Sequence, residues 1–177
     1  GNGFCYLNSV GIGAAHALAA HKKRVCIVDF DVHHGNGTQA MFWADAGLFF
    51  ASTHQMPLYP GTGSASETGE HGNIVNAPLA PFSGSEEFRD AMSDRVLPAL
   101  RSFEPDIIFI SAGFDAHVLD DMSGLKLTEA DYGWIAEELS AIAKTHAQGR
   151  LLSMLEGGYE PSALARSVVA HLKALLG

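Results

Sequence analysis

The sequence places two acids and two imidazoles within six residues, Asp-Phe-Asp-Val-His-His at positions 29–34. They follow the apolar run RVCIV, which is typical of a strand buried on both faces. Buried charges are costly unless they are paired or bind a metal. Because side chains two residues apart in an extended chain point to the same side, Asp31 and His33 can face one ion together. The stretch indicates either a metal site or a structural network of ion pairs.

Further polar groups follow other apolar runs. Asp115 comes after a second predicted strand, and Tyr159 comes after a third. In open α/β sheets, ligands bind outside the carboxyl ends of the strands, where these side chains would meet. Two carboxylates and an imidazole with one open position form the kind of ligand set that catalytic zinc uses. The convergence favours a metal site at Asp31, His33 and Asp115 over a network of ion pairs.

The elements that must position these groups alternate along the chain. Helices are predicted for 8–21, 37–44, 85–103, 127–147 and 161–176, and strands for 24–30, 48–53, 106–113 and 150–158. Because the strands are continuously apolar, we expect an α/β domain built around a mainly parallel sheet. The segment 61–81 is rich in Gly, Ser, Thr and Pro, which predicts a long surface loop. Pro98 is expected to bend the helix in which it lies.

Composition limits the partners. A chain of 177 residues with 47% hydrophobic content is sufficient for one domain with a real core. The net charge is −9 and no basic run is present, so we expect no direct binding of nucleic acid. No apolar stretch approaches the roughly 20 residues of a spanning helix, so we expect no membrane insertion. Cys5 and Cys26 form no CxxC motif, which favours a reducing compartment, and we expect the cytoplasm.

Five motifs resemble successive signatures of the histone deacetylase and acetylpolyamine amidohydrolase family. They are VDFDVHHGNGTQ, YPGTG, ISAGFDAH, DDMSGLKLTEADY and LEGGY, closest to the class II and bacterial branches. The resemblance implies a three-layer arginase/deacetylase-like α/β fold, with residues 1–177 forming a single, partial catalytic domain. It implies a zinc-dependent amidohydrolase that removes acetyl groups from acetylated amines, either acetyl-lysine in proteins or acetylpolyamines.

The resemblance also implies roles for individual residues. The zinc ligands would be Asp31, His33 and Asp115, and Tyr159 would donate to the oxyanion. A potassium-type site would use the Asp29 carboxylate, the Ser52 hydroxyl and the carbonyls of Asp31, His33 and Thr53. A second cation site would use the carbonyls of Phe42, Asp45, Leu48 and Asn73. The substrate would contact Gly3, Phe4, Tyr59 and Met122. From their positions alone, His54 is expected to make a structural hydrogen bond, and His34, which points away from His33 in an extended chain, is expected to support the ligands without binding the metal.

One feature of the family lies outside these residues. The family's general base is a histidine pair upstream of the GFCYLN segment, with which this chain almost begins. We therefore expect the front portion of the domain to be missing, and the 177 residues alone to bind metal but hydrolyse weakly or not at all.

Two other functions stay open. A non-catalytic deacetylase-like module would bind an acyl-amine without hydrolysing it. An arginase-like binuclear metallohydrolase would need extra bridging carboxylates, where this sequence has Gly35 and His117, so one metal fits better. The sequence leaves open which acetylated substrate is used and whether the protein is a homo-oligomer.

Overall fold

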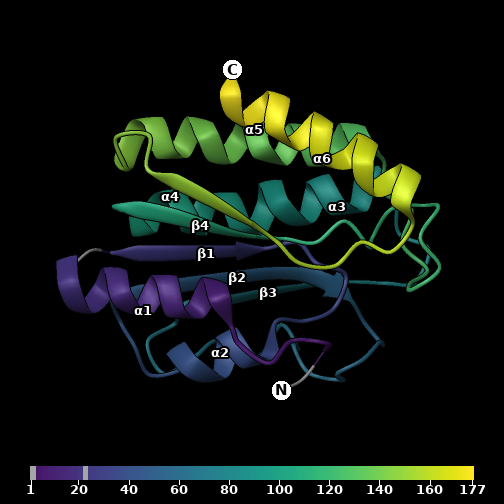
Figure 1. The fold of residues 1–177 in the computed structure, drawn as a ribbon. Helices are drawn as coiled ribbons and strands as arrows, with labels where there is room; N and C mark the ends of the chain where they lie inside the picture. The colour runs from purple at the N-terminus through teal and green to yellow at the C-terminus, as the bar shows by residue number, and fades with distance from the viewer. Residues whose placement is uncertain (1–2, 22–23) are drawn as a thin grey trace.

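A five-stranded, entirely parallel sheet forms the centre of the protein (Figure 1). The computed structural model describes residues 3–21 and 24–177. The strands are β1 (Val25–Asp29), β2 (Leu48–Gln55), β3 (Ile74–Leu79), β4 (Ile107–Ala112) and β5 (Leu151–Leu155), in the spatial order β3-β2-β1-β4-β5. The predicted α/β class and the parallel sheet are confirmed.

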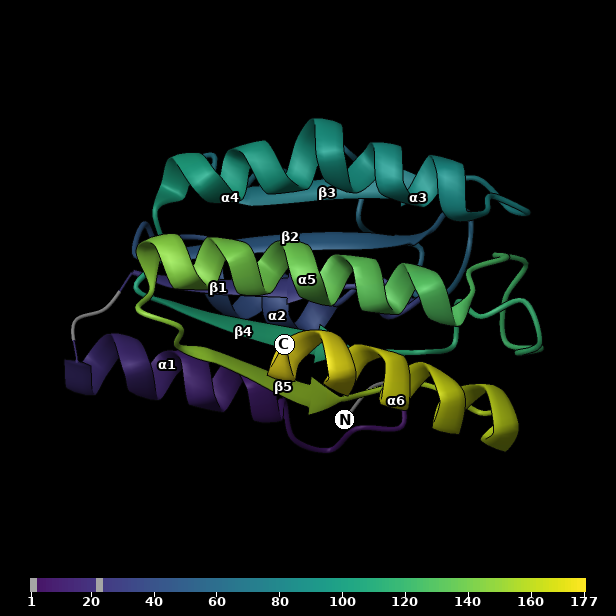
Figure 2. The ribbon, with the colours of Figure 1, turned by 90° about the horizontal axis from the view of Figure 1, so that it is seen from above.

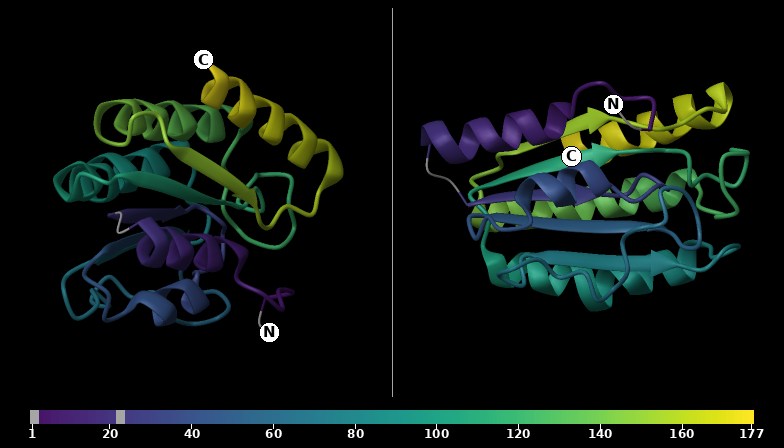
Figure 3. Two further views of the ribbon diagram at one scale, coloured as in Figure 1. Left: turned by 60° about the vertical axis from the view of Figure 1, so that its left-hand side comes forward. Right: turned by 90° about the horizontal axis from the view of Figure 1, so that it is seen from below.

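Helices cover both faces of this sheet (Figures 1 and 2). One face carries α1 (Ser9–His21) and α2 (Asn36–Phe42). The other carries α3 (Ser85–Ala91), the π-helical turn η1 (Met92–Val96), α4 (Leu97–Phe103), α5 (Glu129–His146) and α6 (Pro161–Leu176). None of the helices in the described part of the chain is both long enough and apolar enough to cross a membrane. Because all strands run the same way, the loops after their carboxyl ends gather at one end of the molecule (Figure 3).

Each face of the sheet has its own hydrophobic core. Successive side chains of a strand point to opposite faces. In β1, Cys26 and Val28 therefore pack in the core that includes Leu100 and Leu139, whereas Ile27 packs in the core that contains side chains of α1. All five residues of β1 are buried. This central strand is a rigid platform for the acids at its carboxyl end.

The prediction of a surface loop over 61–81 is wrong for its second half. β3 lies there, pairs in parallel with β2 and forms one edge of the sheet. Its Asn76 is buried, which is tolerated because the side-chain amide donates to Gln39 Oε1 and to the Glu67 carbonyl. Pro78 is tolerated because an edge strand has one side without ladder hydrogen bonds.

The helix predicted over 85–103 is divided in three. α3, η1 and α4 follow one another without a loop, and Pro98 lies in the first turn of α4. Proline cannot donate to the carbonyl four residues earlier and clashes with it in a regular α-helix. A π-helical turn immediately before Pro98 relieves that conflict.

The other edge strand, β5, is more exposed than the central strands. Its Leu152 is 43% exposed and its Leu155 is 63% exposed, whereas every residue of β1 is buried. Over residues 3–21 and 24–177, no strand pairs with the outer side of β5. Only its inner side, which pairs with β4, matches the expectation for a central parallel strand.

One buried acid joins α5 to α3. Asp131 is fully buried, and its Oδ2 accepts hydrogen bonds from the Ser85 hydroxyl at 2.7 Å and from the Thr128 backbone N–H at 2.9 Å. Its Oδ1 accepts from Arg89 Nε at 2.9 Å. The carboxylate thus caps α5 and binds the layer of helices together.

Asp131→Ala should lower the free energy of unfolding by about 1–3 kcal/mol, because Arg89, the Ser85 hydroxyl and both the N–H and the hydroxyl of Thr128 lose their acceptor. Glu137→Ala, which removes an exposed acid from the same helix, should change it by less than about 0.5 kcal/mol. Denaturant unfolding followed by circular dichroism measures both. Equal losses in the two variants would contradict the bridging role.

Candidate active site

The loops after β1 and β4 bring three predicted metal ligands together. His33 Nδ1 lies 3.1 Å from Asp31 Oδ1 and 3.2 Å from Asp115 Oδ2. One ligand atom from each of the three residues lies within 4.8 Å of the others. The two loops are neighbours because β1 and β4 pair in register, with Val28 opposite Ile110.

The two carboxylates also fix the backbone around them. Asp115 Oδ1 accepts from the Val32 N–H at 2.9 Å. Asp31 Oδ1 accepts from the His33 N–H at 2.9 Å, and its Oδ2 accepts from the Gly157 N–H at 2.8 Å. Asp115 Oδ2 is buried and has no well-aligned hydrogen bond within the described residues. An unsatisfied buried carboxylate oxygen indicates that a cation is expected there.

Two glycines leave the space that these carboxylates occupy. A Cβ atom on Gly113 would overlap the Asp31 side chain. A Cβ atom on Gly157 would overlap the carboxylates of both Asp31 and Asp115. The motifs ISAG and LEGG therefore carry glycine because the side chains of the cluster approach their backbone closely.

The cluster concentrates negative charge where water is scarce. Burial raises the pKa of Asp115, and it raises the pKa of Asp29 well above its ordinary value. Burial, together with the charges of Asp31 and Asp115, raises the pKa of Glu156 to about 7. Hydrogen bonding to Asp115 and Asp31 raises the pKa of His33 to about 10. Each of these raised pKa values shows that the site favours an added positive charge, whether a proton or a cation.

A bound metal ion would meet that demand. Two carboxylates and the imidazole nitrogen that faces them form a donor set that suits a divalent metal. Asp115 Oδ2, which is buried without a well-aligned hydrogen bond, is consistent with it. The residues present therefore fit a metal ion.

The predicted phenol lies on a loop that is bonded to this cluster. Tyr159 is two residues beyond Gly157, whose N–H donates to Asp31. Its side chain is 45% exposed, with the ring centroid 6.1 Å from that of Phe4. Burial, followed by the charges of Asp115 and Asp31, raises the pKa of Tyr159 to about 12. The hydroxyl keeps its proton at neutral pH and can donate it in a hydrogen bond.

Two of the predicted substrate contacts, Tyr59 and Phe4, lie beside these groups. The Tyr59 ring lies 6.3 Å from the His33 ring, and Phe4 lies against Tyr159. Gly3 and Phe4 both have left-handed φ angles, of 56° and 63°. Met122 is half-buried in the loop that follows β4. The structure thus gathers aromatic side chains from distant parts of the sequence beside the acid cluster.

The residues of the potassium-type site are also adjacent. Asp29 lies directly opposite Ser52 in the pairing of β1 with β2, and Thr53 is the next residue of β2. All three are buried. Asp29 Oδ1 accepts from the Asp31 N–H at 3.0 Å, and a Cβ atom on Gly35 would overlap its Oδ2. A buried carboxylate beside a hydroxyl suits a small cation.

Residues 1–175 match the family described as Histone deacetylase domain. The chain belongs to this histone deacetylase family. It is 45% identical to "Histone deacetylase 14, chloroplastic" of Arabidopsis thaliana, over 99% of the chain and 42% of that protein.

Solved structures show the same fold. The HDA15 HD domain matches with a TM-score of 0.92 and 37% identity, over all of this chain and 51% of the other. The histone deacetylase Clr3 matches with a TM-score of 0.89 and 34% identity, over 97% of this chain and 30% of the other. The deacetylase-type α/β fold is therefore confirmed.

The chain spans about half the length of these relatives or less. Membership in the family implies a metal ion in the site.

The other histidines near the cluster have partners of their own. His34 Nδ1 bonds to Thr62 Oγ1 at 2.7 Å. His54 Nε2 bonds to the Gly63 carbonyl at 2.9 Å, and burial lowers its pKa to about 4. His117 is buried with Nε2 3.5 Å from Glu129 Oε1. These contacts are consistent with the structural roles expected for His34 and His54.

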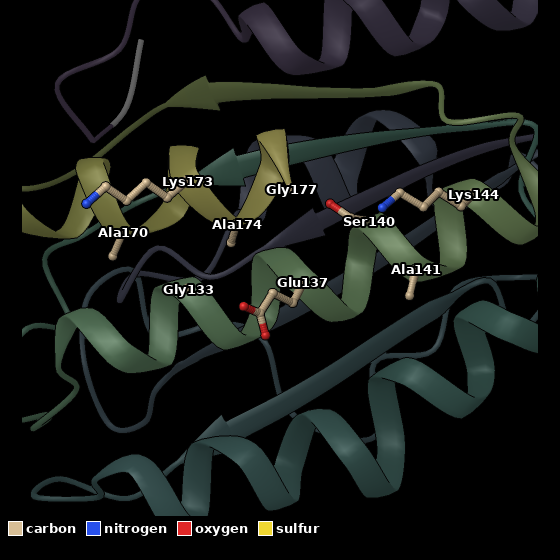
Figure 4. Close-up of a pocket in the computed structure, with 9 residues that line it drawn as sticks. All are labelled: Gly133, Glu137, Ser140, Ala141, Lys144, Ala170, Lys173, Ala174 and Gly177. Carbon is tan, nitrogen blue, oxygen red and sulfur yellow. The ribbon is translucent and has the colours of Figure 1, made fainter.

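A hollow of about 410 Å³ lies elsewhere on the domain, between α5 and α6 (Figure 4). Its lining is mostly small residues, together with the charged side chains of Glu137, Lys144 and Lys173. Neither the acid cluster nor Tyr159 lines it. With one acid and no histidine or cysteine, it lacks the groups that the chemistry needs.

Asp120 is a site residue that the sequence did not reveal. It is 6% exposed, and its Oδ2 accepts from the N–H groups of Tyr159 at 2.7 Å and Glu160 at 3.1 Å. Its Oδ1 accepts from the Met122 N–H at 3.1 Å. The carboxylate joins the tyrosine loop to the loop after β4. The exposed Asp121 beside it has the same side chain, so no local signal separates the two.

Asp120→Ala should loosen the loop that carries Tyr159, because the backbone N–H groups of Tyr159 and Glu160 lose their charged acceptor. Hydrogen–deuterium exchange of the peptide containing Tyr159 and Glu160 should accelerate by about tenfold or more, as expected for losing hydrogen bonds of this type. Asp121→Ala is the matched control and should leave that exchange unchanged. Unchanged exchange in Asp120→Ala would show that other contacts fix the loop.

Proposed function

We propose that this domain is a zinc-dependent amidohydrolase that removes acetyl groups from acetylated amines. The observation that carries the proposal is the position of Asp31 between two functional groups. Its Oδ1 faces the His33 imidazole, and its Oδ2 accepts from Gly157 in the loop that presents Tyr159. A metal ligand and an oxyanion donor are thereby bonded into one unit.

The roles of the residues follow from their chemistry. Zinc held by Asp31, His33 and Asp115 would polarise the amide carbonyl and acidify a bound water. The Tyr159 hydroxyl, protonated because its pKa is raised to about 12, would donate a hydrogen bond where negative charge develops on the carbonyl oxygen. Asp120 would hold the backbone of Tyr159 in place. A potassium ion beside Asp29 and Ser52 would balance the charge behind the ligands.

The proposed substrates are acetyl-lysine in proteins and acetylpolyamines. The Phe4 and Tyr59 rings would flank the apolar methylene chain that precedes the acetylated nitrogen in both. The relatives named histone deacetylase support an acetylated substrate. The negative charge of the chain supports a cationic substrate over nucleic acid.

One alternative is less well supported. A binuclear arginase-like site needs more ligands, and within residues 3–21 and 24–177 one cluster of three metal-binding side chains forms. Gly35 offers no ligand, and the His117 ring lies towards Glu129. A non-catalytic binding module is a second candidate, because it would use the same ligands and differ only in turnover.

Turnover is proposed for the whole protein and not for this segment alone. The chain covers 42% and 51% of two relatives, and the family resemblance implies that the general-base histidine pair precedes the segment GFCYLN. Exposed Leu155, Tyr6 and Leu7 provide apolar surface on which further chain would pack. We also propose a reducing compartment such as the cytoplasm, since Cys5 and Cys26 are both free.

Asp115→Ala should abolish stoichiometric metal binding, because it removes the most deeply buried ligand. We expect about one zinc per chain in the wild type, the number that a single three-ligand site holds. Elemental analysis of the dialysed chain measures it, with Asp121→Ala as a control that should retain the metal. Undiminished zinc in folded Asp115→Ala would rule out this ligand set.

Tyr159→Phe in the full-length protein should keep its metal but reduce turnover of an acetyl-lysine peptide by about 10²–10³, the scale for losing one oxyanion donor. Glu137→Ala, which removes an exposed side chain of α5 outside the acid cluster, serves as the control and should leave the rate unchanged. Steady-state kinetics measures the turnover rate of each variant and of the wild type. A near-normal rate in Tyr159→Phe would make the phenol structural, and a metal-loaded wild type without turnover would favour the binding module.

A further inference from the structure

Three backbone carbonyls converge on one side-chain nitrogen at the start of β3. Asn73 Nδ2 lies 3.1 Å from the carbonyl oxygen of Phe42, 3.2 Å from that of Asp45 and 3.0 Å from that of Leu48. Phe42 ends α2, and Leu48 begins β2, so the three carbonyls belong to one tight turn. We call these three oxygens the carbonyl cage. Asn73 is 5% exposed, and its amide fills the cage from the neighbouring segment.

The cage is the place where the family resemblance implied a second cation. The structure does not fit that expectation, because an amide nitrogen stands where the ion would be bound. Such a nitrogen carries two hydrogens and offers a cation no ligand, whereas potassium in proteins is held by oxygen atoms. The Asn73 backbone carbonyl, the fourth expected ligand, accepts from the Phe50 N–H at 2.9 Å within the β2–β3 ladder. With the amide in this orientation, its nitrogen and an ion cannot occupy the cage together.

The orientation of the amide follows from its surroundings. With Nδ2 inward, its two N–H groups point at three acceptors, while Oδ1 packs against Gly69 without a donor in the described part of the chain. Turning the amide over would place a fourth oxygen among the three carbonyls and leave both N–H groups against Gly69. Without a cation in the cage, an unpaired Oδ1 costs less free energy than four clustered oxygens and two unpaired N–H groups. A cation among the oxygens would reverse that preference.

The cage carries no formal charge. Its groups are neutral carbonyl dipoles, and two of them already accept a backbone hydrogen bond, Phe42 from the Asp45 N–H and Asp45 from the Leu48 N–H. The remaining lone pairs of these carbonyl oxygens need a partner, and an N–H group can serve as that partner as well as an ion can. The same segment is further attached by the Glu70 N–H, which donates to the Trp43 carbonyl at 3.0 Å.

We propose that the Asn73 amide replaces a monovalent cation in this cage, so that the turn between α2 and β2 is bound to the start of β3 without an ion. Of the two monovalent sites that the resemblance implied, the one at Asp29 then remains. This inference concerns folding and ion content and does not depend on the proposed hydrolysis.

The wild-type chain tests the ion count directly. Thallous ion substitutes for potassium, and equilibrium dialysis of the chain against it should show no more than one saturable ion. In Asp29→Asn, which removes the charged ligand of the other site, we expect none. A second saturable ion in the wild type, or one that persists in Asp29→Asn, would overturn the proposal.

Thermal unfolding of Asn73→Asp tests the amide itself, because this substitution keeps the shape and replaces the N–H groups with oxygen. In choline chloride the midpoint should fall by about 5 °C or more, as expected for a buried acceptor set that loses its donor. Asp45→Ala removes a side chain from the same turn but keeps its carbonyl in the cage, and serves as the control. In choline chloride, an Asn73→Asp midpoint no lower than that of Asp45→Ala would overturn the proposal.

Discussion

The carboxylates of Asp31 and Asp115 are the constraint on which the rest of the site depends. Both lie at the carboxyl ends of central strands, and both accept hydrogen bonds from backbone N–H groups of other loops. These bonds fix the loops but do not neutralise the charge, so the cluster still needs a cation. The space for the carboxylates in turn requires glycine at positions 113 and 157. The two buried carboxylates therefore determine the charge of the site, the position of its loops and the glycines at positions 113 and 157.

This constraint explains how much of the site could be predicted. Asp31, His33 and Asp115 are unusual in sequence because acids and imidazoles directly follow apolar strands, and parallel strands bring such residues to one edge. Nothing comparable marks Asp120, whose neighbour Asp121 is identical in type but exposed. The difference between them arises only from the Tyr159 loop, which is distant in sequence. Residues fixed by a local pattern could be predicted, and those fixed by a tertiary hydrogen bond could not.

The errors in the fold have the same physical origin. β3 carries Asn76 and Pro78, which are poor strand formers, and it is stabilised by specific bonds to Gln39 and Glu67 that composition does not reveal. For α3 to α4, the sequence correctly indicated that Pro98 disturbs the helix. It did not indicate that the disturbance is absorbed as a π-helical turn, because that choice depends on how the helix packs on the sheet.

The two cation positions that the family resemblance implied differ in what must be balanced. Asp29 is a buried carboxylate, and burial raises its pKa well above the usual range, so an unprotonated Asp29 needs a full positive charge beside it. The carbonyl cage contains only dipoles, for which the partial positive charge of an N–H group is sufficient. An asparagine at position 73 can therefore substitute for an ion in the cage, whereas a neutral amide beside Asp29 would leave the carboxylate uncompensated. The chain can dispense with the ion that only neutral oxygens would bind, but not with a positive charge near its buried acids.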